Sequence, residues 1–137
     1  MSSSLHPLDG VARIANDQQA LDVARQLATL LQRDSALRDR ERQLPHAELA
    51  LFSRSGLGSI SVPKAFGGAG VSNVTLAQVI ALLAAADGSL GQIPQNHFYA
   101  LEVLRINGSP AQQQRLYSDV LAGQRLGNAL AELGTRT

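Results

Sequence analysis

Residues 63–89 read PKAFGGAGVSNVTLAQVIALLAAADGS, a glycine-rich loop followed by a long apolar segment. The closely spaced glycines predict a loop with positive φ angles, which glycine adopts without strain. Ser72 is a typical N-cap residue, and it predicts a helix from Asn73 to about Ala86 that ends at Asp87-Gly88-Ser89. The centre of this helix is apolar on nearly all sides, which predicts that the helix is buried.

The composition of the 137-residue chain favours an all-α fold. The strong helix formers Leu and Ala occur 22 and 20 times, whereas Val, Ile and Thr together occur 17 times. A chain of this length can bury its own core as one domain. The absence of Cys excludes disulfides, thiolate metal sites and a cysteine nucleophile. A net charge of +1 gives no basic surface, so nucleic acid is not favoured as a partner.

The sequence shows no targeting or membrane segment. Asp9, Arg13 and Asp17 fall where a signal peptide would need an apolar core. The longest purely apolar run, Val79 to Ala86, has eight residues, against roughly 20 for a membrane-spanning helix. We therefore expect a cytoplasmic protein with no membrane partner.

Two helices are predicted before the glycine loop. Asn16 or Asp17 can cap the first helix. Its apolar residues recur at helical spacing on one face, at Leu21, Ala24, Ala28 and Leu31. Pro45 suits the first turn of the second helix, and Gly56 suits the position just after its end. An extended stretch is expected from Ser59 to Val62.

Two more helices are predicted after the loop. One covers about Leu90 to Ile106, and Pro94 either starts it late or kinks it. Ser109-Pro110 combines an N-cap with proline at the first helical position, and it opens a helix that ends at Gly123. The final segment, Leu126 to Leu133, could begin a strand.

Two segments have features of phosphate sites. The alternating charges from Arg38 to Arg42 are typical of a solvated helix end with local ion pairs, and a phosphate-binding patch is the alternative. Gly67-Gly68-Ala69-Gly70 precedes a helix N-terminus, where phosphate can bind. That loop lacks the spacing of a Walker or dinucleotide motif, so the pattern favours a structural turn.

His97 is the most distinctive single residue. It shares one helical stripe with apolar residues, namely Ile93, Leu101 and Leu104. A histidine that faces inward needs a hydrogen-bond partner or a ligand, and the spacing alone leaves a structural and a functional histidine both open. His6 and His46 are expected at the surface, and the spacing of histidines and carboxylates predicts no metal site.

A series of motifs in fixed order covers almost the whole chain from about residue 20. In chain order it comprises Gly56-Leu57, Ile60-Ser61-Val62-Pro63, Phe66-Gly67-Gly68-Ala69-Gly70-Val71-Ser72, Ala85-Ala86-Asp87-Gly88-Ser89, His97, Asn107-Gly108-Ser109, Gln112-Gln113 and Leu121-Ala122-Gly123. The series closely resembles the N-terminal helical domain of the acyl-CoA dehydrogenase superfamily of flavoproteins.

The resemblance implies an enzyme of three domains: N-terminal helices, a middle β-domain and a C-terminal helical bundle. The flavin would lie between the last two domains and a neighbouring subunit. Ser2-Ser3-Ser4 and Pro7 predict a flexible lead-in at 1–15. The resemblance implies the helical domain at 16–123 and the beginning of a truncated middle β-domain at 124–137. The implied fold is all-α with the start of a β-strand at the C-terminal end.

Within the superfamily, the sequence is more similar to monooxygenases than to dehydrogenases. Dehydrogenases carry a Thr-Glu-Pro element where this chain reads Ala131-Glu132-Leu133. Gly127-Asn128-Ala129 resembles the branch that includes dibenzothiophene monooxygenase and the sulfur-acquisition oxidoreductases. The segment from Asp87 to Phe98 is most similar to the sulfur-acquisition group.

The resemblance also implies roles for particular residues. Asn128 would border the flavin ring, and Ala129 and Ala131 would offer it backbone contacts. His97 would be catalytic, facing the same cavity as a hydrogen-bond donor or proton source, which oxygen activation in a dry pocket requires.

These features imply the N-terminal part of a flavin-dependent monooxygenase that acts on small organosulfur compounds and is inactive as this chain alone. The implied cofactor is FMN or FAD, and the implied partners are a small-molecule substrate and a separate flavin reductase. A homo-oligomer, specifically a homotetramer, is expected at full length. The alternatives are an acyl-CoA dehydrogenase with bound FAD and a non-catalytic helical interaction module or remnant.

Overall fold

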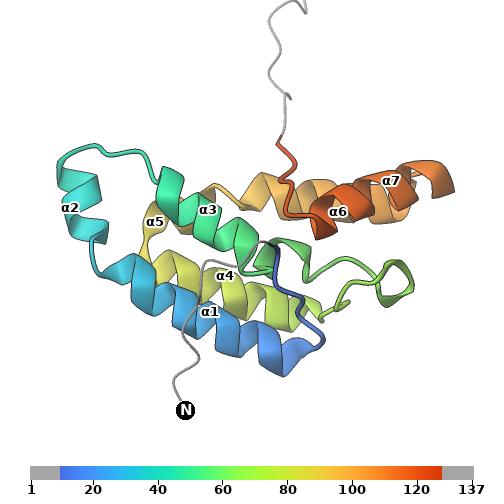
Figure 1. Ribbon diagram of the computed structural model, residues 1–137, viewed down its shortest axis with the longest axis horizontal. Helices are drawn as coiled ribbons and strands as arrows, with labels where there is room; N and C mark the ends of the chain where they lie inside the picture. The colour runs from blue at the N-terminus through green and yellow to red at the C-terminus, as the bar shows by residue number, and fades with distance from the viewer. Residues whose placement is uncertain (1–9, 128–137) are drawn as a thin grey trace, which may run out of the picture.

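The computed structural model describes residues 10–127, and the regular structure in that range is entirely helical (Figure 1). The elements are α1 (Asp17–Gln32), α2 (Ser35–Arg40), α3 (His46–Arg54), η1 (Leu57–Ser59), η2 (Lys64–Phe66), α4 (Asn73–Ala86), α5 (Gly88–Gln92), α6 (Gln95–Asn107) and α7 (Pro110–Leu121). The all-α prediction is confirmed. The expected strand is not seen at Leu126 and Gly127, and its remaining residues lie outside the described range.

Helix starts follow the predicted caps. The Asn16 side chain accepts a hydrogen bond from the backbone of α1, and Ser72 does the same for α4. Ser109 and Gln112 form a complete capping box at the start of α7, with Pro110 at its first position. These bonds satisfy backbone N–H groups that a helix leaves unpaired at its first turn.

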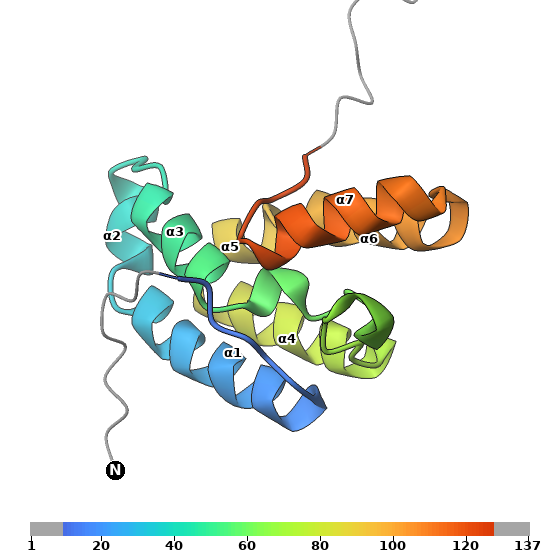
Figure 2. The ribbon, with the colours of Figure 1, turned by 45° about the vertical axis from the view of Figure 1, so that its right-hand side comes forward.

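The helices pack as two groups that share one core. α1 and α4 lie side by side, α3 contacts α1, and α6 lies beside α7 (Figures 1 and 2). The α1 residues that face the core are Ala20, Ala24, Leu27 and Leu31. The predicted stripe is therefore wrong by one position at two places. Ala20 and Leu27 face the core where Leu21 and Ala28 were predicted, and the latter two are half-buried. Small alanines on α1 allow α4 to approach closely.

The prediction that α4 is buried all round is wrong for the described part of the chain. Thr75, Val79 and Leu83 face the core, while Ala77 and Ala81 are exposed. Alanine favours a helix without needing burial, so an alanine-rich sequence looks apolar on every side even where one face meets solvent.

The expected extended stretch at Ser59–Val62 is also wrong. Gly56 adopts a φ of 82° after α3, and the chain then enters the 3₁₀ helix η1 and a further turn. Backbone bonds from Ser59 N–H to Gly56 and from Val62 N–H to Ser59 close these turns. The apolar side chains here are buried by turns rather than by a strand.

Pro94 separates two helices, in agreement with the prediction that it interrupts the helical stretch. α5 ends at Gln92, and Pro94 is the N-cap residue of α6. Proline lacks the N–H that a continuous helix would need at this position. His97 lies in the first turn of this new helix, with its Nε2 atom 2.6 Å from the carbonyl oxygen of Gly58 in η1.

Candidate functional site

His97 lies in the core between α6, η1 and the chain that follows α7. Its exposed fraction is 1%, as its position on the apolar stripe predicts. Its Nε2 atom lies 2.6 Å from the carbonyl oxygen of Gly58, and its Nδ1 atom lies 3.0 Å from the backbone nitrogen of Leu126. The ring therefore joins three segments that are far apart in the sequence.

These two bonds determine which ring nitrogen carries hydrogen. A carbonyl oxygen only accepts, so Nε2–H donates to Gly58. A backbone N–H only donates, so Nδ1 accepts from Leu126 and carries no hydrogen. His97 is thus held as the neutral Nε2–H tautomer.

The surroundings of the ring favour the neutral form. Burial lowers the pKa of His97 below its ordinary value of 6.5. The bond to Gly58 opposes this shift, whereas the nearby positive charge of Arg125 lowers the pKa further. A proton added to Nδ1 would also break the bond from Leu126.

A surface pocket opens beside this histidine. Its lining comes from the end of α5, the first turn of α6 and the segment after α7, namely Ile93, Asn96, His97, Gly123, Gln124, Arg125, Leu126 and Gly127. The pocket therefore combines a buried imidazole, two amide side chains and a stretch of irregular backbone. Its lining is mainly polar, with apolar surface from Ile93 and Leu126.

The other predicted site residues lie beyond this pocket in the sequence. Asn128, Ala129 and Ala131 fall outside the described residues, so their proposed flavin contacts stay a prediction. The last described residues, Leu126 and Gly127, line the pocket and lead directly to them.

A buried ion-pair cluster was missed by the sequence analysis. The Arg38 cluster, defined as Arg38, Glu48 and Asp87, joins α2, α3 and the α4–α5 turn. The Arg38 guanidinium lies 2.6 Å from Asp87 and 3.0 Å from Glu48, and it also donates to the Leu31 carbonyl. The solvated-end interpretation is therefore wrong for Arg38, which is buried.

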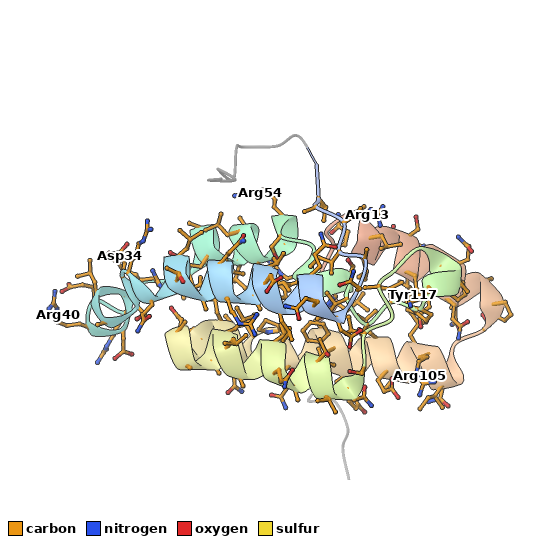
Figure 3. All side chains as sticks on the ribbon, turned by 90° about the horizontal axis from the view of Figure 1, so that it is seen from below. Arg13, Asp34, Arg40, Arg54, Arg105 and Tyr117 are labelled. Carbon is orange, nitrogen blue, oxygen red and sulfur yellow. The ribbon has the colours of Figure 1, made fainter. Side chains whose placement is uncertain are left out.

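The rest of the charge run behaves as predicted. Arg40 pairs locally with Glu41 at 3.0 Å, and both are exposed. Figure 3 shows Arg40 pointing outward at the α2 end of the molecule.

The glycine loop is a structural turn, as the pattern favours. Gly67 and Gly70 have φ angles of 89° and 55°. The backbone N–H groups of Gly67, Gly68 and Gly70 all donate to carbonyls within the loop and its preceding turn. Because a phosphate cradle needs free N–H groups, this loop does not provide one.

The described residues form neither a metal site nor a membrane-spanning helix. Residues 10–127 contain no group of three or more His, Asp or Glu that could hold a metal ion. In the same range, no helix is long and apolar enough to cross a membrane. His46 is exposed, as expected, and His6 lies outside the described range.

Comparisons with known proteins agree with the motif series. Residues 15–124 match the family described as acyl-CoA dehydrogenase, N-terminal domain. Dibenzothiophene monooxygenase of Rhodococcus erythropolis is 35% identical over 121 residues, which cover 88% of this chain and 29% of that enzyme. The probable FMNH2-dependent monooxygenase SfnC of Pseudomonas putida is 34% identical over 119 residues, or 86% of this chain and 30% of that protein.

Solved structures give the same relationship. TdsC of Paenibacillus sp. A11-2, a dibenzothiophene monooxygenase, superposes with a TM-score of 0.68 at 37% identity, covering 75% of this chain and 26% of TdsC. The FMN-bound form of TdsC superposes equally well. This chain spans about three tenths of the length of the curated relatives. With its matched region covering most of the chain, this protein belongs to the acyl-CoA dehydrogenase family, and residues 15–124 are its N-terminal domain.

Proposed function

We propose that this chain is the N-terminal domain of a flavin-dependent monooxygenase that oxidises small organosulfur compounds. The observation that carries the proposal is the sequence identity of 34–35% to dibenzothiophene monooxygenase and SfnC over 86–88% of the chain. The pocket beside His97 supports it, because the buried imidazole lies next to Leu126 and Gly127, which precede Asn128 in the sequence.

The described residues fit one wall of a flavin site rather than a complete one. The pocket offers the amide side chains of Asn96 and Gln124 and the exposed backbone near Gly127, groups that can hydrogen-bond a flavin ring or its substrate. We propose that Asn128 borders the flavin ring and that Ala129 and Ala131 contribute backbone contacts. A bound reduced flavin would supply the activation of dioxygen, which no side chain of this domain can provide.

We propose that His97 contributes to the reaction as part of this pocket wall. Its neutral ring closes the pocket toward the core and excludes water from that side. Because both ring nitrogens bond backbone groups, the ring offers no free N–H to the pocket.

The names of the relatives favour particular partners. SfnC is described as FMNH2-dependent and TdsC is crystallised with FMN, so we propose FMN as the cofactor. Reduced flavin would then come from a separate reductase in the cytoplasm. We further propose that the full-length protein is a homotetramer.

A domain exchange tests the proposed function. The N-terminal domain of R. erythropolis dibenzothiophene monooxygenase is replaced by this chain, and dibenzothiophene oxidation is measured with chemically reduced FMN. We expect oxidation that requires reduced FMN, because 35% identity should preserve the faces that meet the other domains. The unmodified enzyme is the control.

One outcome of the exchange would contradict the proposal. A folded hybrid that binds FMN and consumes oxygen, yet transfers none of it to dibenzothiophene, would show that this domain does not support the reaction.

A further inference from the structure

The chain leaves the helical domain through two anchored residues. After α7, the Arg125 guanidinium donates to the Leu49 carbonyl at 3.0 Å and to the Ser53 hydroxyl, both on α3. The next residue, Leu126, donates its backbone N–H to Nδ1 of His97. One anchor is an exposed arginine, and the other is a buried imidazole.

The histidine is itself rigidly held. Its opposite nitrogen donates to Gly58 at 2.6 Å, and its ring lies 5.2 Å from the ring of Phe98. A Cβ at Gly58 would lie 3.5 Å from Nε2, so the η1 turn approaches the ring closely. An acceptor fixed in this way gives Leu126 one defined position rather than a range.

We infer that His97 is a positioning residue that sets where the chain leaves the helical domain toward Asn128. This inference rests on the proposed function, in which the segment beginning at Asn128 contacts the flavin. His97 then acts through the backbone of Leu126 and not by giving a proton to the reaction.

Two substitutions of His97 each keep one of its two hydrogen bonds and remove the other. In His97→Asn, the amide oxygen can occupy the place of Nδ1 and accept from Leu126, while the bond to Gly58 is lost. In His97→Gln, the longer amide can reach the place of Nε2 and donate to Gly58, while Leu126 loses its acceptor. Both variants are polar, uncharged and unable to serve as a proton source near neutral pH.

Amide hydrogen exchange of the full 137-residue chain gives the first measurement. We expect the Leu126 amide to exchange at least roughly fivefold faster in His97→Gln than in His97→Asn, because an unmade buried bond is costly. The nitrogen shifts of the His97 ring in the unsubstituted chain should show the Nε2–H tautomer. This measurement needs no flavin, so it holds whether or not the proposed function is correct.

The second measurement uses the domain-exchanged enzyme. His97→Gln should weaken FMN binding by roughly fivefold or more relative to His97→Asn, because only His97→Asn keeps an acceptor for the Leu126 N–H. Equal loss of turnover in both variants, with unchanged FMN binding, would overturn positioning and favour proton transfer. Equal Leu126 exchange in both variants would overturn it as well. An unsubstituted hybrid without FMN-dependent oxidation would contradict the proposed function instead.

Discussion

Among single residues, Arg38 shows how a charged side chain can belong to the core. It bonds two carboxylates and a carbonyl while only 8% of it is exposed. Asp87 is also the N-cap of α5, accepting from the backbone N–H groups of Ser89 and Leu90. The Arg38 cluster therefore fixes α2 and the start of α5 at the same time.

Replacing Arg38 by Met should destabilise the domain strongly. Asp87 and Glu48 would lose their shared cation in a buried setting, and breaking such a pair costs about 3–5 kcal/mol. The free energy of unfolding is measured with urea. Arg40→Met is the matched control, because Arg40 is 72% exposed and its pair with Glu41 should contribute at most about 1 kcal/mol. Similar losses in the two variants would contradict the structural role of the cluster.

The lowered pKa of His97 predicts a pH dependence of stability. Below its ordinary pKa of 6.5 the unfolded state binds a proton that the folded state resists, so stability falls as the pH falls. The loss ends once the pH is below the folded pKa, where both states are protonated. Arg125 is the charged group that opposes protonation in the fold.

The check compares unfolding free energies of the unsubstituted chain and His97→Asn at about pH 7.5 and about pH 5.5. The advantage of the unsubstituted chain should shrink at the lower pH, because the two proteins differ only at position 97. An advantage that is the same at both values would mean that His97 titrates alike in the folded and unfolded states.

For single residues, the sequence predicts whether a side chain faces the core better than it predicts the hydrogen-bond partners of that side chain. Helical spacing places His97 inward, because its neighbours on the stripe are apolar. Its partners Gly58 and Leu126 lie 39 and 29 residues away, and no local pattern encodes such distances. The burial of Arg38 was not predictable for the same reason, since its partner Asp87 is 49 residues away in the sequence. The charged residues next to Arg38 instead favour an exposed position.

At the scale of elements, α5 depends on a glycine where it packs against α4. A Cβ added to Gly91 would lie 2.5 Å from the Ala84 Cβ and 2.6 Å from the Ala84 Cα. Because the second of these is a backbone atom, the helices would have to move apart. Gly88, at the start of the same helix, has no atom within 4 Å of an added Cβ.

Gly91→Ala should therefore cost about 1–3 kcal/mol, the usual penalty for overpacking. Gly88→Ala should change the free energy of unfolding by less than about 1 kcal/mol, because alanine has the better helix propensity and meets no neighbour. Urea unfolding of both variants makes the comparison. If the two substitutions have the same effect, helix propensity and not packing limits α5.

Element ends were the most predictable part of the fold. Asn16, Ser72 and Ser109 cap the helices that they were expected to cap, because capping depends on bonds within about four residues. The stretch at Ser59–Val62 was not predictable in this way. Its β-branched residues Ile60 and Val62 favour a strand locally. The positive φ of Gly56 instead starts the 3₁₀ helix η1, after which both side chains are buried in the core.

For the whole molecule, aromatic contacts join the two groups of helices. Phe98 on α6 meets Phe52 on α3 edge to face, with their ring centroids 6.5 Å apart. Tyr117 on α7 packs on Phe66 of η2, with their ring centroids 4.8 Å apart. The buried apolar residues of the described chain form one continuous cluster. The length of the chain predicts a single core, whereas helix periodicity leaves the relative placement of the helices open.

A single shared core predicts that the chain unfolds as one cooperative unit. The sequence has two tyrosines and no tryptophan, and Tyr99 is 55% exposed, so Tyr99→Phe leaves buried Tyr117 as the only tyrosine reporter. Its fluorescence follows the contact between α7 and η2, whereas far-UV circular dichroism follows all helices. We expect both signals to change at the same urea concentration, because separating α7 would expose Tyr117, Val120 and Leu121. A fluorescence transition at lower urea would show that α6 and α7 form an independent unit, and the anchor that His97 provides would then open before the rest of the domain.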